Sequence, residues 1–153
     1  MVSLTLEGDN RGLGAAIGGY LGAKATRAQN DLTVLVVGDG SFLFGVPASA
    51  YWMARRYGTP FLTIVLNNGG WKSPRLSMLG VHPNGVGASL PSKDLHVTFG
   101  PDSPDFGKIA EAAGGAWNKI LKDPKEVDAV MREAIEAVKG GRCAVLDVWI
   151  EKF

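Results

Sequence analysis

VVGDGSFLFGVPASAYWMARRYGTPFLTIVLNNGG, residues 36–70, contains the clearest indication of the fold of this chain. An apolar run enters it and ends at an acidic residue, Asp39, that lies between two glycines. A second apolar run, FLTIVL at 61–66, ends at the pair Asn67-Asn68. Continuous apolar runs of this length are typical of strands buried on both faces of a parallel sheet. The stretch therefore predicts a strand, a crossover and a second parallel strand.

The crossover between the two strands is predicted to be a helix. Pro47 suits the first turn of a helix, and Gly58 suits the position that follows its last turn. Upstream, the Ala- and Gly-rich residues 13–28 predict a helix that packs closely against the sheet. Downstream, helices and strands are expected to alternate in the order helix, strand, helix, strand at 103–114, 116–121, 123–138 and 143–150. The predicted fold is α/β: a single three-layer domain, with a mostly parallel sheet and helices on both faces.

Composition limits the classes of partner. A chain of 153 residues with 46% apolar and 20% charged residues is about one folded domain. Its formal charge of +1 and its scattered basic residues predict no nucleic-acid partner. No apolar run reaches the roughly 18 residues of a membrane span, so we expect no membrane partner and an intracellular protein, in the cytoplasm or an organelle. The lone Cys143 excludes an internal disulfide and is predicted to be a buried structural thiol.

Periodicity lapses between residues 67 and 104, where Gly, Pro, Ser and Asn dominate. We predict one long loop at 69–103, and loops of that length in compact domains are usually functional or disordered. His82 in this loop is a weak catalytic candidate, with a solvated loop residue as the alternative. Lys72 and Arg75 either neutralise a substrate carboxylate or keep the loop in solvent. Three other aromatic residues in regular elements are predicted to lie in the core: Trp52, Trp117 and Trp149.

The polar residues that follow the two predicted strands, Asp39 and the pair Asn67-Asn68, predict a ligand site. Ligands of open α/β sheets bind beyond the carboxyl ends of the strands. The carboxylate of Asp39 and an asparagine carboxamide offer hard oxygen ligands, which suit Mg²⁺ or Ca²⁺. Glycines beside Asp39 let backbone N–H groups approach a ligand, at the start of a helix. Each motif alone is also an ordinary turn, but together, on neighbouring strands, they favour a diphosphate site.

The order Gly-Asp-Gly followed by Asn-Asn resembles the thiamine diphosphate motif, whose two parts lie about 25–30 residues apart. Asn68 follows Asp39 by 29 residues (68 − 39). Residues 12–150 resemble the C-terminal cofactor domain of the acetolactate synthase, benzoylformate decarboxylase and pyruvate decarboxylase superfamily. GLGAAIGGYLGAKA, at 12–25, is similar to the helix that precedes the motif in those enzymes. The dinucleotide fingerprint fits less well, because its third glycine is replaced by Ile17.

The resemblance implies the cofactors thiamine diphosphate and Mg²⁺. It assigns the metal to the side chains of Asp39 and Asn68 and to the backbone carbonyl of Gly70. The residues implied to contact the cofactor or support its turn are Gly38, Asp39, Gly40, Ser41, Asn67, Asn68, Gly70 and Trp71. For Trp71, a role in covering the cofactor and a role in packing both stay open. Residues 69–90 correspond to a loop that closes over the cofactor.

The resemblance also implies a partner. In the family, the cofactor ylid attacks a 2-oxo acid after activation by a glutamate in a separate pyrimidine-binding domain, supplied by the partner subunit. No glutamate of this chain has that context: Glu7, Glu111, Glu126, Glu133, Glu136 and Glu151. We therefore expect a module that is inactive alone and works with that domain of another chain, or in a homo- or hetero-oligomer.

Alternatives stay open for the start of the domain and for the function. Residues 1–11 do not match the family and are expected to be a truncated or alternative start, with the cofactor domain at 12–153. Leu13 either supports the bent cofactor or packs in the core. The predicted function is the cofactor-binding module of a 2-oxo acid decarboxylase or carboligase, a lyase or transferase. The alternative is a non-catalytic nucleotide- or phosphate-binding module.

Overall fold

A computed structural model describes residues 2–7 and 32–152. They form a five-stranded sheet in the order β1-β2-β3-β5-β4, in which every neighbouring pair is parallel. The strands are β1 (Val2–Glu7), β2 (Leu32–Gly38), β3 (Leu62–Asn67), β4 (Trp117–Leu121) and β5 (Ala144–Trp149). The helices of the body are α2 (Asp39–Phe44), α3 (Pro47–Tyr57), α6 (Phe106–Gly114) and α7 (Val127–Lys139), with a 3-10 turn, η1, at Pro124–Glu126.

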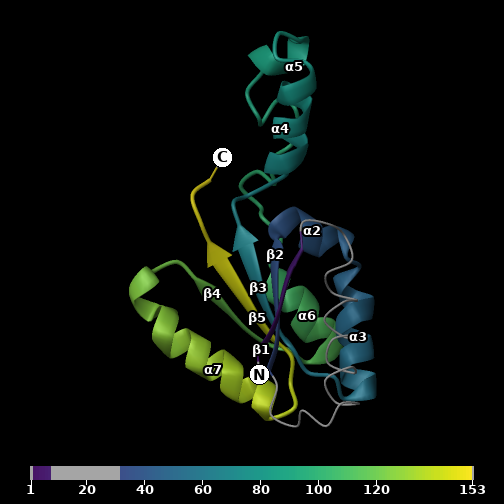
Figure 1. The fold of residues 1–153 in the computed structure, drawn as a ribbon, viewed down its shortest axis with the longest axis vertical. Helices are drawn as coiled ribbons and strands as arrows, with labels where there is room; N and C mark the ends of the chain where they lie inside the picture. Colours follow the sequence, from purple (N-terminus) through teal and green to yellow (C-terminus); the bar gives the residue numbers. More distant parts are fainter. Residues whose placement is uncertain (1, 8–31, 153) are drawn as a thin grey trace.

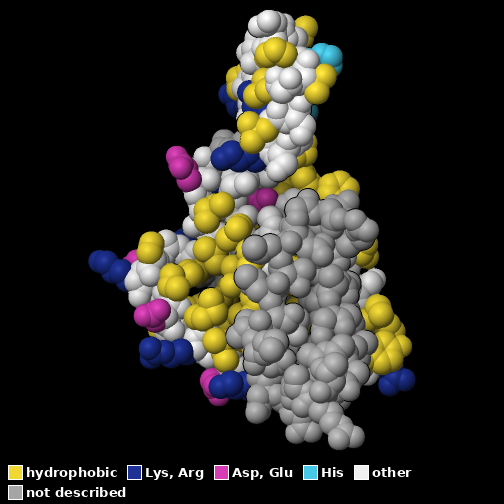
Figure 2. Space-filling view, viewed as in Figure 1, with side chains coloured by type: hydrophobic (Ala, Val, Ile, Leu, Met, Phe, Trp, Pro, Cys, Tyr) yellow, Lys and Arg dark blue, Asp and Glu magenta, His cyan; other side chains and the backbone are white. Residues whose placement is uncertain are grey.

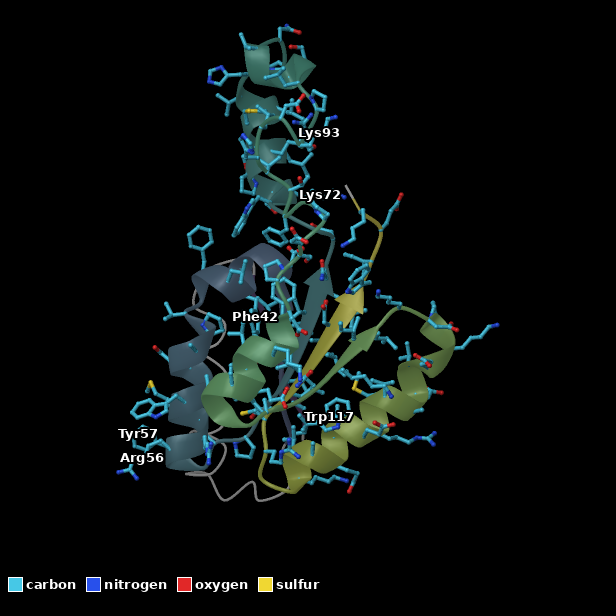
Figure 3. The ribbon with its side chains drawn as sticks, turned by 180° about the vertical axis from the view of Figure 1, so that it is seen from behind. Phe42, Arg56, Tyr57, Lys72, Lys93 and Trp117 are labelled. Atoms are coloured by element: carbon cyan, nitrogen blue, oxygen red, sulfur yellow. The ribbon has the colours of Figure 1, made fainter. Side chains whose placement is uncertain are left out.

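Helices cover both faces of the sheet, so the predicted three-layer α/β architecture is confirmed (Figure 1). On one face, α2, α3 and α6 pack around Phe42, whose ring meets that of Phe106 edge-on at 5.5 Å between centroids (Figure 3). On the other face, α7 contributes Val130 and Ala134 to a second cluster, against which Trp117 packs. Both clusters are apolar, because every central strand is buried on both faces.

The predicted helix signals act where the sequence places them. Pro47 occupies the first turn of α3, and Gly58 ends it in the left-handed conformation. Asp105 caps α6 by accepting a hydrogen bond from the Lys108 backbone N–H at 2.8 Å. Asp123 likewise accepts from the Lys125 N–H, at 2.9 Å, at the start of η1 and α7.

The start of the chain joins the sheet as an edge strand. Residues 2–7, which belong to the stretch expected to be a truncated or alternative start, form β1 and pair with β2 from Val2 to Glu7. A strand at the edge of a sheet is hydrogen-bonded to one neighbouring strand only, which for β1 is β2. The helix expected at 13–28, and Leu13 within it, lie outside the described residues.

The expected long loop at 69–103 instead carries two helices, α4 (Lys72–Val81) and α5 (Val86–Ser89). They form an arm that projects beyond the carboxyl ends of the strands (Figure 1). Neither helix buries a residue, and hydrophobic side chains lie on the arm's surface (Figure 2). The sequence shows no apolar stripe here because this helix pair has no core to face.

Two of the three tryptophans predicted to be core are exposed. Trp52 is 57% exposed and Trp149 is 37% exposed, so for these two the prediction was wrong. The neighbour of Trp52 on α3, Tyr51, is the residue that faces the sheet, and its hydroxyl donates to Thr63 at 2.7 Å. Aromatic content alone does not say which side of a helix a residue occupies. Among the described residues, no helix has the length and apolarity needed to cross a bilayer.

Candidate functional site

The sheet brings the residues that follow β2 and β3 together. Gly38, the last residue of β2, is paired with Leu66 of β3, so both chains leave the sheet at the same edge. The Asp39 side chain is 2% exposed and turns toward the residues after β3. Its Oδ2 accepts hydrogen bonds from the backbone N–H groups of Gly69 at 2.8 Å and Gly70 at 3.1 Å. The prediction that these strand ends adjoin is confirmed.

The turn after β3 is held by its own asparagines. Asn67 Oδ1 accepts from the Gly69 N–H at 3.1 Å, and Asn68 Oδ1 accepts from the Gly70 N–H at 3.2 Å. Gly69 has a φ of +87°, which a residue with a side chain rarely adopts. The turn therefore needs glycine at 69 and a short side chain with an oxygen at 67.

A cavity of about 380 Å³ opens above this turn. That volume lies in the range of small-molecule sites. Its lining contains seven of the eight residues expected at the site: Gly38, Asp39, Gly40, Ser41, Asn68, Gly70 and Trp71. Asn67 is fully buried beneath the turn. Residues of the arm complete the wall: Lys72, Ser73, Pro74 and Ser77, with Phe44 from α2.

The oxygen atoms around the turn keep acceptor capacity for a ligand. The Asp39 carboxylate has about four lone-pair sites, of which the N–H groups of Gly40, Gly69 and Gly70 engage three. Asn68 Oδ1 and the Gly70 carbonyl each accept one hydrogen bond, the latter from the Lys72 N–H at 3.1 Å. Each oxygen thus retains a site, and an all-oxygen set of this kind suits a hard cation such as Mg²⁺.

Trp71 forms one wall of the cavity. Its ring lies against Gly40, where an added Cβ would collide with it. It also meets the rings of Phe44 and Phe99 edge-on, at 5.1 and 5.2 Å between centroids. The backbone N–H of Trp71 donates to the Val97 carbonyl at 2.7 Å, so both ends of the arm's base are tied together.

Comparison with known proteins identifies the family. The family model described as thiamine pyrophosphate enzyme, C-terminal TPP binding domain, matches residues 3–148. The chain belongs to this family. The resemblance read from Gly-Asp-Gly and Asn-Asn is thereby confirmed, and the chain is a thiamine diphosphate-binding domain. A comparison with curated protein sequences gave no match.

Two solved structures share the fold of this thiamine diphosphate-binding domain. Benzoylformate decarboxylase from Polynucleobacter necessarius superposes with a TM-score of 0.72 at 18% identity, over 100% of this chain and 30% of its own. The Rhodococcus jostii RHA1 thiamine diphosphate-dependent 4-hydroxybenzoylformate decarboxylase gives 0.62 at 21% identity, over 95% of this chain and 23% of its own. The chain therefore spans less than a third of the length of either enzyme.

Three residues of the domain reach the turn although sequence reasoning assigned them no role there. Asp147 on β5 is 3% exposed and accepts from Asn67 Nδ2 at 2.9 Å. Trp149 Nε1 donates to the other oxygen of Asp147 at 3.3 Å, and Lys152 Nζ donates to Asn67 Oδ1 at 3.3 Å. Burial raises the pKa of Asp147, and the hydrogen bonds from Asn67 and Trp149 partly oppose this. A carboxylate inside the apolar run CAVLDVWI is the one signal that marks it.

The remaining candidates lie elsewhere. His82 is exposed and follows the last residue of α4. Because α4 has its first turn at the cavity and ten residues at 1.5 Å each, His82 lies roughly 15 Å along the arm. Arg75 donates from Nη2 to the Leu90 carbonyl at 3.1 Å, which ties α4 to the chain after α5. Lys72 alone of the predicted cationic pair lines the cavity.

Proposed function

We propose that this domain binds thiamine diphosphate together with Mg²⁺ and serves as the cofactor module of a 2-oxo acid decarboxylase or carboligase. The observation that carries the proposal is the convergence of Asp39, Asn68 and the Gly70 carbonyl at one cavity. Asp39, Asn68 and Gly70 supply the metal ligands, and phosphate oxygens and water complete the shell, as Mg²⁺ usually requires.

The neighbouring residues hold the diphosphate. Gly38 and Gly40 bring backbone close to the cavity, and the Ser41 hydroxyl offers a donor there. Lys72 adds a cation to the cavity wall, where it offsets the charge of a diphosphate. Trp71 covers the site with apolar surface and limits the access of water. When bound, the cofactor supplies the nucleophilic carbon and the electron sink that decarboxylation of a 2-oxo acid needs.

The activating acid comes from a second domain in this proposal. Asp39 is the one carboxylate that lines the cavity among the described residues, and three backbone N–H groups already engage it. A carboxylate held this way cannot serve as the glutamate that protonates the cofactor's pyrimidine. We therefore propose that a pyrimidine-binding domain completes the site, in an oligomer or from another chain, and that the domain alone does not turn over substrate.

Calorimetric titration of thiamine diphosphate into the full chain tests the site. We expect saturable binding with Mg²⁺ that disappears with EDTA and in Asp39→Ala. Asp39→Asn keeps the shape and one ligand oxygen but removes the negative charge, so we expect weaker binding by a chain that stays folded, which separates an effect on the metal from loss of the fold. Asp128→Ala, at an exposed position of α7, is the matched control and should bind as the parent does.

Two results would contradict the proposal. One is the absence of binding at millimolar thiamine diphosphate by a chain whose circular dichroism shows it to be folded. The other is equal or tighter binding of ADP with Mg²⁺, because ADP shares the diphosphate but not the thiamine. That second result would favour the alternative of a nucleotide- or phosphate-binding module.

A further inference from the structure

The carboxyl end of β5 reaches the turn that carries the proposed metal ligands. In the sheet, Asn67 of β3 is paired with Trp149 of β5, and Asp147 lies two residues before Trp149. Side chains two apart on a strand share a face, so Asp147 points to the same face as Asn67. Both are almost fully buried, and their 2.9 Å hydrogen bond joins residues 80 positions apart in sequence.

The partners of Asn67 leave one orientation for its carboxamide. Asp147 is acceptor-only when ionised, so it must face the amide nitrogen. The Gly69 N–H and the Lys152 ammonium are donors only, so they must face the amide oxygen. A flipped Asn67 would oppose donor to donor and acceptor to acceptor at every contact. Asp147 therefore anchors the amide nitrogen of Asn67 and, together with the Gly69 N–H and Lys152, keeps its oxygen toward the turn.

The oriented oxygen of Asn67 acts on Asp39 through a shared backbone group. The Gly69 N–H is bonded to Asn67 Oδ1 at 3.1 Å and to Asp39 Oδ2 at 2.8 Å. A change in the position of Gly69 would move both the carboxylate of Asp39 and the next residue, Gly70. Lys152 supports the same arrangement, since its Nζ lies 4.3 Å from the centre of the Trp149 ring and its side chain lies over Gly69.

We propose that Asp147 is a positioning residue for the metal turn: it orients Asn67, which places the Gly69 N–H on Asp39 and so sets the geometry of the ligand oxygens. Asp147 touches neither metal nor cofactor. This inference rests on the proposed function for its consequence, a weaker Mg²⁺ and thiamine diphosphate site when Asp147 is lost.

Amide hydrogen exchange of Gly69, measured by NMR on the full chain without cofactor, tests the positioning step directly. Asp147→Leu keeps the approximate size but removes the acceptor, whereas Asp147→Asn keeps one acceptor oxygen, which we expect to face the closer donor, Asn67. A net hydrogen bond is worth up to about 1.5 kcal/mol. We therefore expect exchange at Gly69 to accelerate by up to about tenfold in Asp147→Leu, with Asp147→Asn near the parent.

Tyr51→Phe is the control for general loosening. It removes a buried hydrogen bond to Thr63, in the core between α3 and the sheet, so it lowers stability without touching the turn. The inference is overturned if Asp147→Leu leaves Gly69 exchange equal to that of Asp147→Asn. It is also overturned if exchange rises equally at Gly69 and at the core amide of Val145, as in Tyr51→Phe.

Titration of the same variants with thiamine diphosphate and Mg²⁺ separates the two proposals. We expect the Kd to rise by about tenfold in Asp147→Leu and to stay near the parent value in Asp147→Asn. If the parent itself binds no thiamine diphosphate, the proposed function fails, and the exchange data still decide whether Asp147 positions the turn. If the parent binds and the Kd of Asp147→Leu is unchanged, the positioning role is overturned.

Discussion

Position 40 requires glycine because the Trp71 ring packs directly against it. The Trp71 ring lies where a Cβ at position 40 would be. Gly40→Ala should therefore lower the free energy of unfolding by about 1–3 kcal/mol, the usual range for overpacking. In a Trp71→Ala background the same change should be neutral or stabilising, because alanine is better than glycine in a helix by about 0.5–1 kcal/mol. Urea unfolding of the two single variants and the double variant measures this coupling.

If the effects of Gly40→Ala and Trp71→Ala on the free energy of unfolding are additive, the Trp71 ring moves away from position 40 without an energetic cost. Gly80→Ala is the matched control, because Gly80 lies in α4 and nothing stands within 4 Å of its Cβ position. It should be neutral or stabilising in either background. The sign of the coupling therefore reports the contact between α2 and the cavity wall, apart from helix propensity.

Cys143 is expected to be inert in the folded chain. Burial raises the pKa of its thiol from 9.0 to about 11. At pH 8 the folded protein should thus hold about 100-fold less thiolate than the unfolded chain and react correspondingly slowly with iodoacetamide. The unfolded thiol ionises near pH 9, but the folded one keeps its proton to about pH 11. Stability should therefore fall as the pH rises through that window.

Labelling is simple to follow because the chain has one cysteine. Mass spectrometry of native and urea-unfolded protein at pH 8 gives both rates. A native rate close to that of the unfolded chain would contradict a buried, protonated thiol. Slow native labelling would support the sequence expectation of a structural cysteine.

Among the helices and strands, the sequence predicted those that pack against a core and missed those that do not. The runs that became β2, β3 and β5 were predicted because buried parallel strands are continuously apolar. Asp105 and Asp123 marked their helices because capping is local chemistry, written in adjacent residues. The arm was missed because α4 and α5 bury no residue, and so their sequences carry no apolar period.

The arm is predicted to be the first described element that a protease cuts. The trypsin sites of the arm and of the chain that returns from it after α5 are Lys72, Arg75 and Lys93, and Figure 3 labels Lys72 and Lys93. Few buried contacts hold it, so it should open at a lower free energy than the sheet. Arg75→Ala removes the bond to the Leu90 carbonyl and should accelerate cleavage at Lys93, whereas Arg132→Ala on α7 should not. Mass spectrometry of timed digests identifies the order of the cuts.

Among the described residues, a first cut in α7 or after Arg142, just before β5, would contradict this order. An unchanged rate at Lys93 in Arg75→Ala would show that the Arg75 bond does not restrain the arm. Faster cleavage would show that the hydrogen bond from Arg75 to the Leu90 carbonyl stabilises the arm. The competing expectation, that Arg75 neutralises a substrate carboxylate, assigns it no part in holding the arm.

At the scale of the whole molecule, the site depends on strand order. Asp39 and the asparagine pair were predictable because their strands follow one another and one crossover joins them. Asp147 and Lys152 were not, because only the order β3-β5 places the end of the chain beside Asn67. Sequence spacing contains no such information for strands separated by β4 and the four helices α4, α5, α6 and α7. The ligand oxygens were thus predictable, whereas the residues that hold them in place became visible only in the sheet.

Cofactor binding should stabilise the entire domain, because the site joins β2, β3 and the arm. A ligand that binds only the folded state, at 100 times its Kd, adds about 2.7 kcal/mol to the free energy of unfolding. For a chain of this size, about 2–4 °C per kcal/mol predicts a rise in Tm of about 5–10 °C. Differential scanning calorimetry with thiamine diphosphate and Mg²⁺ should show this rise, and EDTA should abolish it. Asp128→Ala should keep the shift and Asp39→Asn should reduce it, because the amide oxygen is a neutral ligand. An undiminished shift in Asp39→Asn would place the ligand away from the turn, whereas a shift abolished by EDTA and reduced in Asp39→Asn would tie the stability of the sheet to the metal at its carboxyl edge.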